Sequence, residues 1–345
     1  MLPVGRTGGG AALEIHVDTV TVHPERTFTI ARGSSDSFER VIPTLREAGL
    51  SGRGEAAPTG RYGQDAAGVA AALRGVSVRD PWDIEGTLRS NGSLPPSGLA
   101  ALDAALYDLA ARRLGVPVYR LLGLARPEPV TAYTLGISDP GTTVEEARRL
   151  SGRFPILKVK VGGWEEIGTV RAVAEAVPGA ELWVDANEAF SSAEAVEAAG
   201  ELAAAGVAVI EQPTPASEGP EALRAVREGA GGVPVVADES CLTARDVPPL
   251  AGCVDGVNVK LAKCGGLRGA LAVVHTARAH GMRLMLGCMV ETALGICTAA
   301  QVSGLFDFVD LDGSLLLADD PFSGPAYDGA RMILPETPGL GVEGP

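Results

Sequence analysis

Two lysines and an acidic residue stand at the ends of two neighbouring predicted strands. The segment Phe154–Gly163 reads FPILKVKVGG, and Lys158 and Lys160 alternate in it with apolar residues. Because a strand projects residues i and i+2 to the same face, both ammonium groups are expected on one side. After a helix-length connection, an apolar strand at Leu182–Val184 leads to Asp185. Two amines and a carboxylate at adjacent strand ends predict a polar site on a β/α scaffold.

Polar residues also close the other predicted strands of this region. They are Asn187 in DAN, Glu211 in VIEQP, Asp238 and Glu239 in VADES, Lys260 in VNVKLAKCGG, and Asp310 and Asp312 in VDLDG. A single charged strand end is often only a solvated edge residue. Carboxylates that close three consecutive strands, with lysine-bearing strands before and after them, instead predict one shared active face.

The three carboxylates Asp185, Glu211 and Asp238 are expected to converge from neighbouring strands. Close carboxylates repel one another unless a cation lies among them. Ligation by oxygen atoms alone suits Mg²⁺, or Mn²⁺, better than zinc, and the four histidines form no HxH or HExxH motif. The sequence therefore predicts a Mg²⁺ site on these carboxylates. Asn187 and Glu239 are expected either as neighbours that orient the ligands or simply as polar residues at strand ends.

In strand order, Lys160 precedes the carboxylates and Lys260 follows them, so a barrel would place the two lysines across its mouth. A substrate carboxylate on the metal would then hold its α-carbon between two amines. One amine removes the α-proton, the other returns a proton to the opposite face, and the metal stabilises the enediolate between the two steps. The sequence thus predicts a 1,1-proton transfer. Lys263 follows the same strand and is expected at the surface or beside the ligands.

An aspartate pair closes the last predicted strand. Asp310 and Asp312 share a face by alternation. With three carboxylates already assigned to the metal, this pair suggests recognition of a cation, for which a substrate α-ammonium group is the natural candidate. Alternatively, the pair fixes the turn before Gly313.

The elements that must position these residues alternate between strand and helix from about Pro129. Eight apolar strands are predicted near Thr131–Leu135, Ile156–Val161, Leu182–Val184, Val207–Ile210, Val233–Ala237, Gly256–Leu261, Arg283–Leu286 and Phe306–Val309. Stretches of helical period separate them, which favours an α/β fold of the (β/α)8-barrel type. A doubly wound sheet is the alternative, but no GxGxxG follows the first strand.

The first third of the chain predicts a separate α+β unit. Alternating apolar residues from Leu13 to Val22 predict a strand, and the leucines of Ser97–Arg113 fall on one face of a helix. Asp103 and Asp108 on that helix are expected at the surface or in helix–helix contacts. The predicted division is a capping domain over 11–120, a barrel over 121–317, and a segment over 318–345 that returns to the capping domain.

Composition narrows the class of partner. The net charge of −14 argues against nucleic acid and against an anionic membrane surface, since both require a basic footprint. No apolar run is long enough for a membrane span. The five cysteines are scattered without a CxxC pair, which is typical of reduced cysteines in a cytoplasmic protein.

The motifs together resemble the enolase superfamily, in its muconate-lactonizing-like subgroup, over nearly the whole chain. The similarity covers ALDAALYDLAARRLGVPVYRLLG, KVKVG, DANEAF, IEQP, ADES, NVKLAKCGG and VDLDG. Within that subgroup, the DLDG pair and the segments IARGS, TGRYG and LGCM resemble the dipeptide epimerases, above all the L-Ala-D/L-Glu epimerases.

The resemblance implies a Mg²⁺-dependent isomerase of cell-wall peptide metabolism. It would epimerise a dipeptide, L-Ala-D/L-Glu, at the α-carbon of the C-terminal residue, with the two acid/base lysines and three metal ligands named above. It places Thr134 and Lys158 near the substrate. It also gives the loop Cys288–Glu291, with Cys288 and Val290, a role in specificity, and it leaves Arg32 or Arg61 as binder of the glutamate carboxylate.

Two alternatives remain open at this point. One is an N-acylamino acid racemase or o-succinylbenzoate synthase, whose substrates have no free α-ammonium group for Asp310 and Asp312 to bind. The other is a non-catalytic ligand-binding barrel. The expected partner is a small dipeptide, with no nucleic acid and no membrane, and further copies of the chain in a homo-oligomer are a second candidate.

Overall fold

Eight parallel strands form one curved sheet in the computed structural model, which describes residues 13–344. The predicted domain start at residue 11 lies outside these residues. The strands are β6 (Tyr133–Leu135), β7 (Ile156–Lys160), β8 (Glu181–Asp185), β9 (Val209–Glu211), β10 (Val235–Ala237), β11 (Gly256–Val259), β12 (Arg283–Leu286) and β13 (Phe308–Val309). Every predicted strand is present. Neighbours in the sheet are consecutive in the chain, so the doubly wound alternative is wrong.

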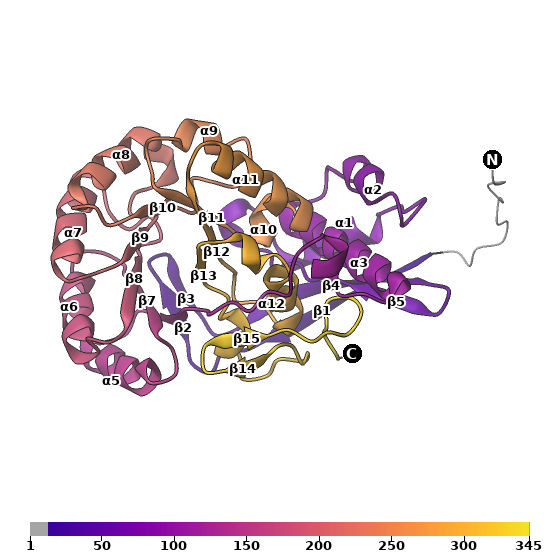
Figure 1. Ribbon diagram of the computed structural model, residues 1–345, viewed down its shortest axis with the longest axis horizontal. Coiled ribbons are helices and arrows are strands. Elements are labelled where there is room, and N and C mark those ends of the chain that lie inside the picture. Colours follow the sequence, from indigo (N-terminus) through magenta and orange to yellow (C-terminus); the bar gives the residue numbers. More distant parts are fainter. Residues whose placement is uncertain (1–12, 345) are drawn as a thin grey trace.

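Helices follow the strands and cover the outer face of the sheet (Figure 1). They are α5 (Pro140–Ser151), α6 (Glu166–Ala176), α7 (Ser192–Ala204), α8 (Pro220–Gly229), α9 (Val247–Leu250), α10 (Leu261–Cys264), α11 (Leu267–Ala279) and α12 (Ala293–Ala300). At the seam between β6 and β13, the backbone N–H of Ala132 donates to Val309 O at 2.9 Å. The predicted barrel type is therefore confirmed.

Alternation within the strands decides which side chains reach the barrel interior. On β8, Leu182 and Val184 pack against the helices, whereas Trp183 belongs to a separate interior cluster with Val209 of the next strand. Asp185 has the parity of Trp183 and therefore lies on the interior face. A register slip of one residue would exchange the two faces. Burying a Val or Leu side chain stabilises by about 1.5–3 kcal/mol, so the apolar face holds the polar one in place.

The first third of the chain forms an antiparallel sheet with helices packed on it. Its elements are β1 (Glu14–Val22), β4 (Phe38–Glu47) and β5 (Leu50–Arg53), the hairpin β2 (Phe28–Ile30) and β3 (Gly33–Ser35), η1 (Gly60–Tyr62), α1 (Ala66–Arg74), α2 (Ile84–Ser90), α3 (Pro96–Leu114) and α4 (Val118–Leu121). Helix α3 ends at Gly115, whose φ of 69° suits a glycine C-cap. It packs so closely on β5 that a Cβ at Gly52 would collide with Ala105 O.

The end of the chain returns to this first unit. After the hairpin β14 (Ala326–Asp328) and β15 (Arg331–Ile333), Leu340 N donates to Asp108 Oδ1 on α3 at 2.8 Å. Asp103 on the same helix accepts from Leu267 N, at the start of α11, at 2.6 Å. Both aspartates are buried, so the option of a surface position is wrong and both serve contacts between elements.

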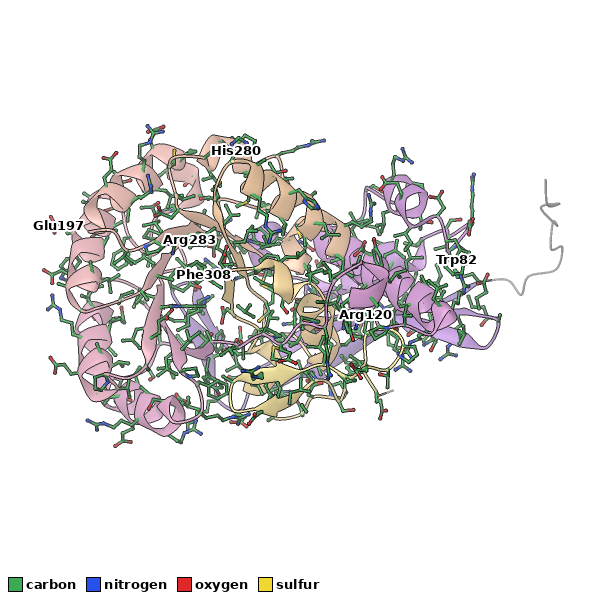
Figure 2. All side chains as sticks on the ribbon, viewed as in Figure 1. Trp82, Arg120, Glu197, His280, Arg283 and Phe308 are labelled. Atoms are coloured by element: carbon green, nitrogen blue, oxygen red, sulfur yellow. The ribbon has the colours of Figure 1, made fainter. Side chains whose placement is uncertain are left out.

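Exposed polar side chains lie on the outer faces of the barrel helices. Figure 2 shows Glu197 on α7 and His280 beyond the end of α11 pointing away from the barrel. No helix within residues 13–344 has the length and apolar character needed to cross a membrane.

Candidate active site

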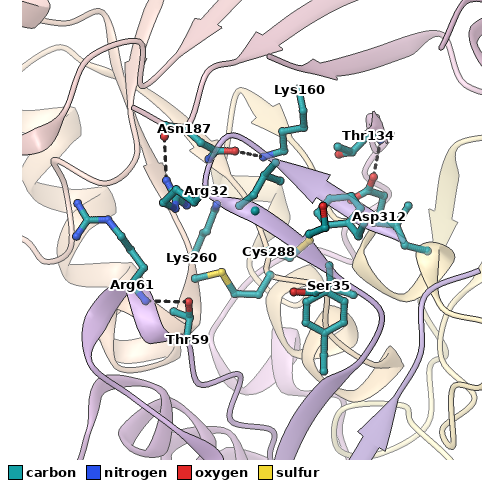
Figure 3. Close-up of a pocket in the computed structure, with 18 of the residues that line it drawn as sticks. Arg32, Ser35, Thr59, Arg61, Thr134, Lys160, Asn187, Lys260, Cys288 and Asp312 are labelled. Carbon is teal, nitrogen blue, oxygen red and sulfur yellow. Dashed lines mark hydrogen bonds between the residues drawn. The ribbon is translucent and has the colours of Figure 1, made fainter. Parts of the chain in front are cut away.

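Part of the set of polar strand ends lines a cavity of about 450 Å³ between the barrel and the capping domain (Figure 3), whereas Asp185, Glu211, Asp238 and Glu239 are buried outside its lining. Barrel residues in its lining include Thr134, Lys158, Lys160, Asn187, Lys260, Cys288, Val290, Asp310 and Asp312. The capping domain contributes the hairpin β2–β3 and the segment around η1, which carry Arg32 and Arg61. Cavities at the carboxyl ends of barrel strands are the usual place for chemistry in this architecture.

The two predicted acid/base lysines contact different carboxylates. Lys160 Nζ, on β7, lies 2.5 Å from Asp185 Oδ2 and 3.0 Å from Asn187 Oδ1. Lys260 Nζ, directly after β11, lies 2.8 Å from Asp238 Oδ2. Three strands separate β7 from β11 in the sheet, so the lysines flank the row of carboxylates. Burial alone would lower the pKa of Lys260, but Asp238 and the other carboxylates raise it well above its usual value.

Lys158 lies deepest, among three carboxylates. Its Nζ is 3.0 Å from Asp185 Oδ2, 2.7 Å from Glu211 Oε2 and 2.7 Å from Asp310 Oδ2. Burial opposes the charged form, yet Asp185 and the other two carboxylates outweigh it and raise the pKa of Lys158 well above its usual value. Its ammonium group therefore compensates charge at the centre of the site.

Asp185, Glu211 and Asp238 are the candidate ligands for Mg²⁺. Within residues 13–344, no three His, Cys, Asp or Glu side chains already form a group that could hold an ion, and Lys158 and Lys260 contact these carboxylates instead. The chemistry of the donors nevertheless fits. All three are buried and offer only oxygen atoms as ligands, and burial followed by repulsion from Asp185 raises the pKa of Glu211 to about 7. A divalent ion would relieve that repulsion.

Asn187 contacts the predicted ligand Asp185, whereas Glu239 reaches the ligands only through Asn187. Asn187 N donates to Asp185 Oδ1 at 2.9 Å, and Asn187 Nδ2 donates to Glu239 Oε1 at 3.3 Å. Glu239 Oε1 also accepts from Arg32 Nη1 at 2.8 Å. The two residues thus link the carboxylate row to the capping domain.

The aspartate pair lies at the opposite wall of the cavity. Asp312 Oδ2 accepts from Thr134 N at 2.6 Å, while Asp310 contacts Lys158. Asp310 Oδ1 is buried and has no hydrogen-bond partner. Burial, and then the charge of Asp310, raise the pKa of Asp312 to about 7. A bound ammonium group would offset the cost of keeping two negative carboxylates close together and buried.

The loop Cys288–Glu291 forms another wall and is fixed by the capping domain. Arg40 Nε donates to Val290 O at 2.9 Å. Glu55 accepts from Thr292 N at 3.0 Å and from Gly295 N at 3.1 Å, at the N-terminus of α12. The capping domain therefore sets the position of residues predicted to decide specificity.

Lys263, expected at the surface or beside the ligands, lies beside a predicted ligand, and Gln212, which was not predicted, joins it there. Lys263 is buried, and its Nζ donates to Asp238 O at 2.7 Å, to two further carbonyl groups and to the Asp238 carboxylate, so a surface position is wrong. Gln212 Oε1 accepts from Asp238 N at 2.8 Å. A signal for Lys263 existed: the chain has only four lysines, and all four lie at this site.

This fold and this site define an enzyme built on a capped (β/α)-barrel with a lysine–carboxylate centre. Two family models match the chain: "Mandelate racemase / muconate lactonizing enzyme, N-terminal domain" over residues 14–123, and "Enolase C-terminal domain-like" over 142–344. The chain belongs to the mandelate racemase/muconate lactonizing enzyme family of the enolase superfamily. The family resemblance of its motifs is thereby confirmed.

Several relatives have established names. The chain is 36% identical to the hydrophobic dipeptide epimerase of Roseobacter litoralis, across 95% of this chain and 98% of that protein. It is 39% identical to the L-Ala-D/L-Glu epimerase of Escherichia coli, across 85% and 91%. A dipeptide epimerase from Enterococcus faecalis, complexed with Mg and L-Leu-L-Tyr, superimposes with a TM-score of 0.90 at 32% identity, across 95% of this chain and 98% of that one.

Proposed function

We propose that this protein is a Mg²⁺-dependent dipeptide epimerase, an isomerase that inverts the α-carbon of a dipeptide's C-terminal residue. One observation carries the proposal: Lys160 and Lys260 line a single cavity and flank the buried carboxylates from opposite ends of the row. The names of the relatives support the dipeptide as the class of substrate.

Asp185, Glu211 and Asp238 are the residues that would hold Mg²⁺. Asn187 would orient Asp185 directly, and Glu239 would act on it through Asn187. When bound, Mg²⁺ supplies positive charge that offsets the charge of these carboxylates and of the substrate carboxylate. Lys158, which contacts Asp185 and Glu211, is the ammonium group best placed to attract the substrate carboxylate as well.

The proton transfer falls to Lys160 and Lys260. One lysine must be a neutral amine that accepts the α-proton, while the other is an ammonium that delivers a proton to the opposite face. The roles exchange for the opposite epimer. Asn187 Oδ1 accepts from Lys160 Nζ at 3.0 Å, which fixes the direction of that amine. The carboxylates around Lys260 favour its ammonium form, the form that donates a proton.

The substrate's α-ammonium group is proposed to bind Asp310 and Asp312. Both line the cavity, both are buried, and Asp310 Oδ1 has no hydrogen-bond partner. Thr134 holds Asp312 through its backbone N–H. This pair favours a free dipeptide over an N-acylated amino acid, which has no such ammonium group.

The C-terminal side chain would lie against a wall of mixed character. Apolar lining comes from Phe28, Ile30, Val290 and Leu316, and Cys288 lies beside them, whereas Arg32 and Arg61 supply positive charge. L-Ala-D/L-Glu remains the proposed substrate because the arginines suit a glutamate carboxylate. The apolar residues suit a hydrophobic dipeptide, as the name of the Roseobacter relative indicates for that protein.

Deuterium exchange tests the reaction. Purified protein with Mg²⁺ in D₂O would be incubated with L-Ala-L-Glu, L-Ala-L-Leu or N-succinyl-L-Glu, and α-proton loss and epimer formation followed by NMR. We expect exchange with epimerisation for at least one dipeptide and none for the N-succinyl compound. Preferred turnover of N-succinyl-L-Glu would indicate an N-acylamino acid racemase, and metal binding without any exchange would indicate a ligand-binding barrel.

We further propose a cytoplasmic role in cell-wall peptide metabolism. None of the five cysteines is in a disulfide, which fits a reducing compartment. We also propose that the chain assembles into a homo-oligomer, which size-exclusion chromatography with light scattering would test.

A further inference from the structure

A carboxylate behind the cavity wall engages both arginines of that wall. Arg61 Nε and Nη2 each donate to Glu188 at 2.8 Å, in a bidentate pair. Arg32 Nη1 lies 3.5 Å from Glu188 Oε2 and 2.8 Å from Glu239 Oε1. Two guanidinium groups thus face two carboxylates, and the charges of this cluster of Arg32, Arg61, Glu188 and Glu239 balance one another.

The backbone that carries Glu188 is held in an unusual conformation. Asn187 and Glu188 follow β8 with φ angles of 44° and 72°, a region that side chains with a Cβ rarely occupy. Glu188 N donates to Gln212 O at 2.9 Å, and Glu188 Oε1 accepts from Ala216 N at 2.8 Å. Backbone strain of this kind persists where the surroundings enforce it, and it clusters at functional sites. Here it directs a carboxylate toward the two arginines.

The position of the cluster relates it to the substrate. Arg32 and Arg61 line the cavity and keep about a third of each side chain exposed, at 33% and 36%. The Glu188 side chain is only 11% exposed. An entering substrate would therefore meet the guanidinium groups first, while their balancing charge lies behind them.

We propose that Glu188 is a specificity-determining residue, an internal carboxylate that competes with an acidic substrate side chain for Arg32 and Arg61. The inference rests on the proposed dipeptide epimerisation. A glutamate side chain in the substrate gains the arginines only by weakening their contacts with Glu188, whereas an uncharged side chain leaves the cluster intact. Glu188 thus shifts the preference of the pocket from acidic toward uncharged C-terminal residues.

The test compares two substrates that differ in charge and hardly in shape, L-Ala-L-Glu and L-Ala-L-Gln. The ratio of their kcat/KM values would be measured for the wild type, for Glu188→Gln and for Glu197→Gln. Glu197 lies on the outer face of α7 (Figure 2) and loses the same charge far from the cavity. We expect the Glu/Gln ratio to rise about fivefold in Glu188→Gln and to stay at the wild-type value in Glu197→Gln.

A second variant, expected to change the Glu/Gln ratio in the opposite direction, keeps the test informative if Glu188→Gln fails to fold. Arg61→Gln removes a guanidinium and leaves Glu188 in excess, so the Glu/Gln ratio should fall about fivefold. High salt should reduce both changes, because screening weakens contacts between exposed charges. A merely structural residue would lower turnover of both dipeptides equally and leave their ratio unchanged.

Failure of the role of Glu188 can be distinguished from failure of the proposed epimerase function. If the wild type epimerises dipeptides but Glu188→Gln leaves the ratio unchanged, Glu188 does not determine specificity and the proposed function stands, whatever Arg61→Gln does. If the wild type epimerises no dipeptide, the proposed function fails, and the role of Glu188 fails with it.

Discussion

Lysine is a rare residue in this chain, and the site uses all of it. The sequence has 29 lysine and arginine residues, of which only Lys158, Lys160, Lys260 and Lys263 are lysines, and all four are buried. An arginine keeps its proton at any pH that a protein tolerates and cannot act as a base. A lysine can lose its proton, and its compact ammonium group fits between carboxylates. The chain thus keeps the amine for the place where proton transfer and close ion pairing are needed.

At the residue scale, removal of either acid/base lysine should separate exchange from inversion. Lys160→Ala and Lys260→Ala should each lower epimerisation by at least about a hundredfold, because each face of the α-carbon has one amine. The lysine that remains can still exchange the α-proton of the epimer that faces it. L-Ala-L-Glu and L-Ala-D-Glu would be incubated separately with each variant in D₂O and followed by NMR.

The two variants serve as controls for each other, since each should retain exchange with the epimer that the other loses. Mg²⁺ binding, measured by the shift in unfolding midpoint, should survive in both. Near-normal epimerisation by either variant, or exchange of the same epimer by both, would contradict the two-base assignment.

At the scale of elements, the strands and their polar ends were predictable and the contacts across the fold were not. The strand β12 has its predicted bounds, and β8 exceeds its prediction by one residue at each end, because apolar alternation followed by a charged residue is a local signal. Glu188 and Arg61 are 127 residues apart, and no local pattern announces their pairing. The positive φ of Glu188 was equally hidden, since glycine, the usual marker of that conformation, is not used there.

The junction between α3 and α11 predicts a pH dependence of stability. Asp103 is buried, accepts from Leu267 N, and leaves Oδ1 without a partner. Burial raises its pKa to about 8 from an ordinary 3.8. Between these values the folded protein keeps a proton that the unfolded chain has released, so this group's contribution to the free energy of unfolding falls as pH rises from about 4 to about 8.

Asp103→Asn would remove that dependence, because the amide is neutral at every pH. The free energy of unfolding, measured by urea titration at intervals from pH 5 to 8.5, should fall less steeply in the variant than in the wild type. The advantage of the variant should be largest near pH 8. Parallel curves for the two proteins would show that Asp103 is ionised throughout this range.

On the scale of the whole molecule, the cavity is a joint product of barrel and cap. The barrel supplies the lysines and carboxylates, whereas Arg40 and Glu55 of the cap hold the loop Cys288–Glu291 and the start of α12. The end of the chain in turn binds the cap through Asp108. The cap thereby positions the walls around the substrate, and the chemistry remains on the rigid strands.

The charge balance inside the barrel predicts how the molecule responds to loss of metal. Four buried carboxylates, Asp185, Glu211, Asp238 and Asp310, contact the four lysine ammonium groups. Because the lysines already compensate these charges, chelation with EDTA should abolish epimerisation yet leave the protein folded. The unfolding midpoint should fall by only a few degrees, about what a ligand near its Kd contributes.

Added Mg²⁺ should restore epimerisation and the unfolding midpoint in the wild type and in the control variant Glu197→Gln. Glu211→Gln, which removes one charged ligand, should show a smaller rise of the midpoint with Mg²⁺. Unfolding of the wild type on chelation at room temperature would contradict this balance, since it would show that the ion, and not the lysines, holds the carboxylates together.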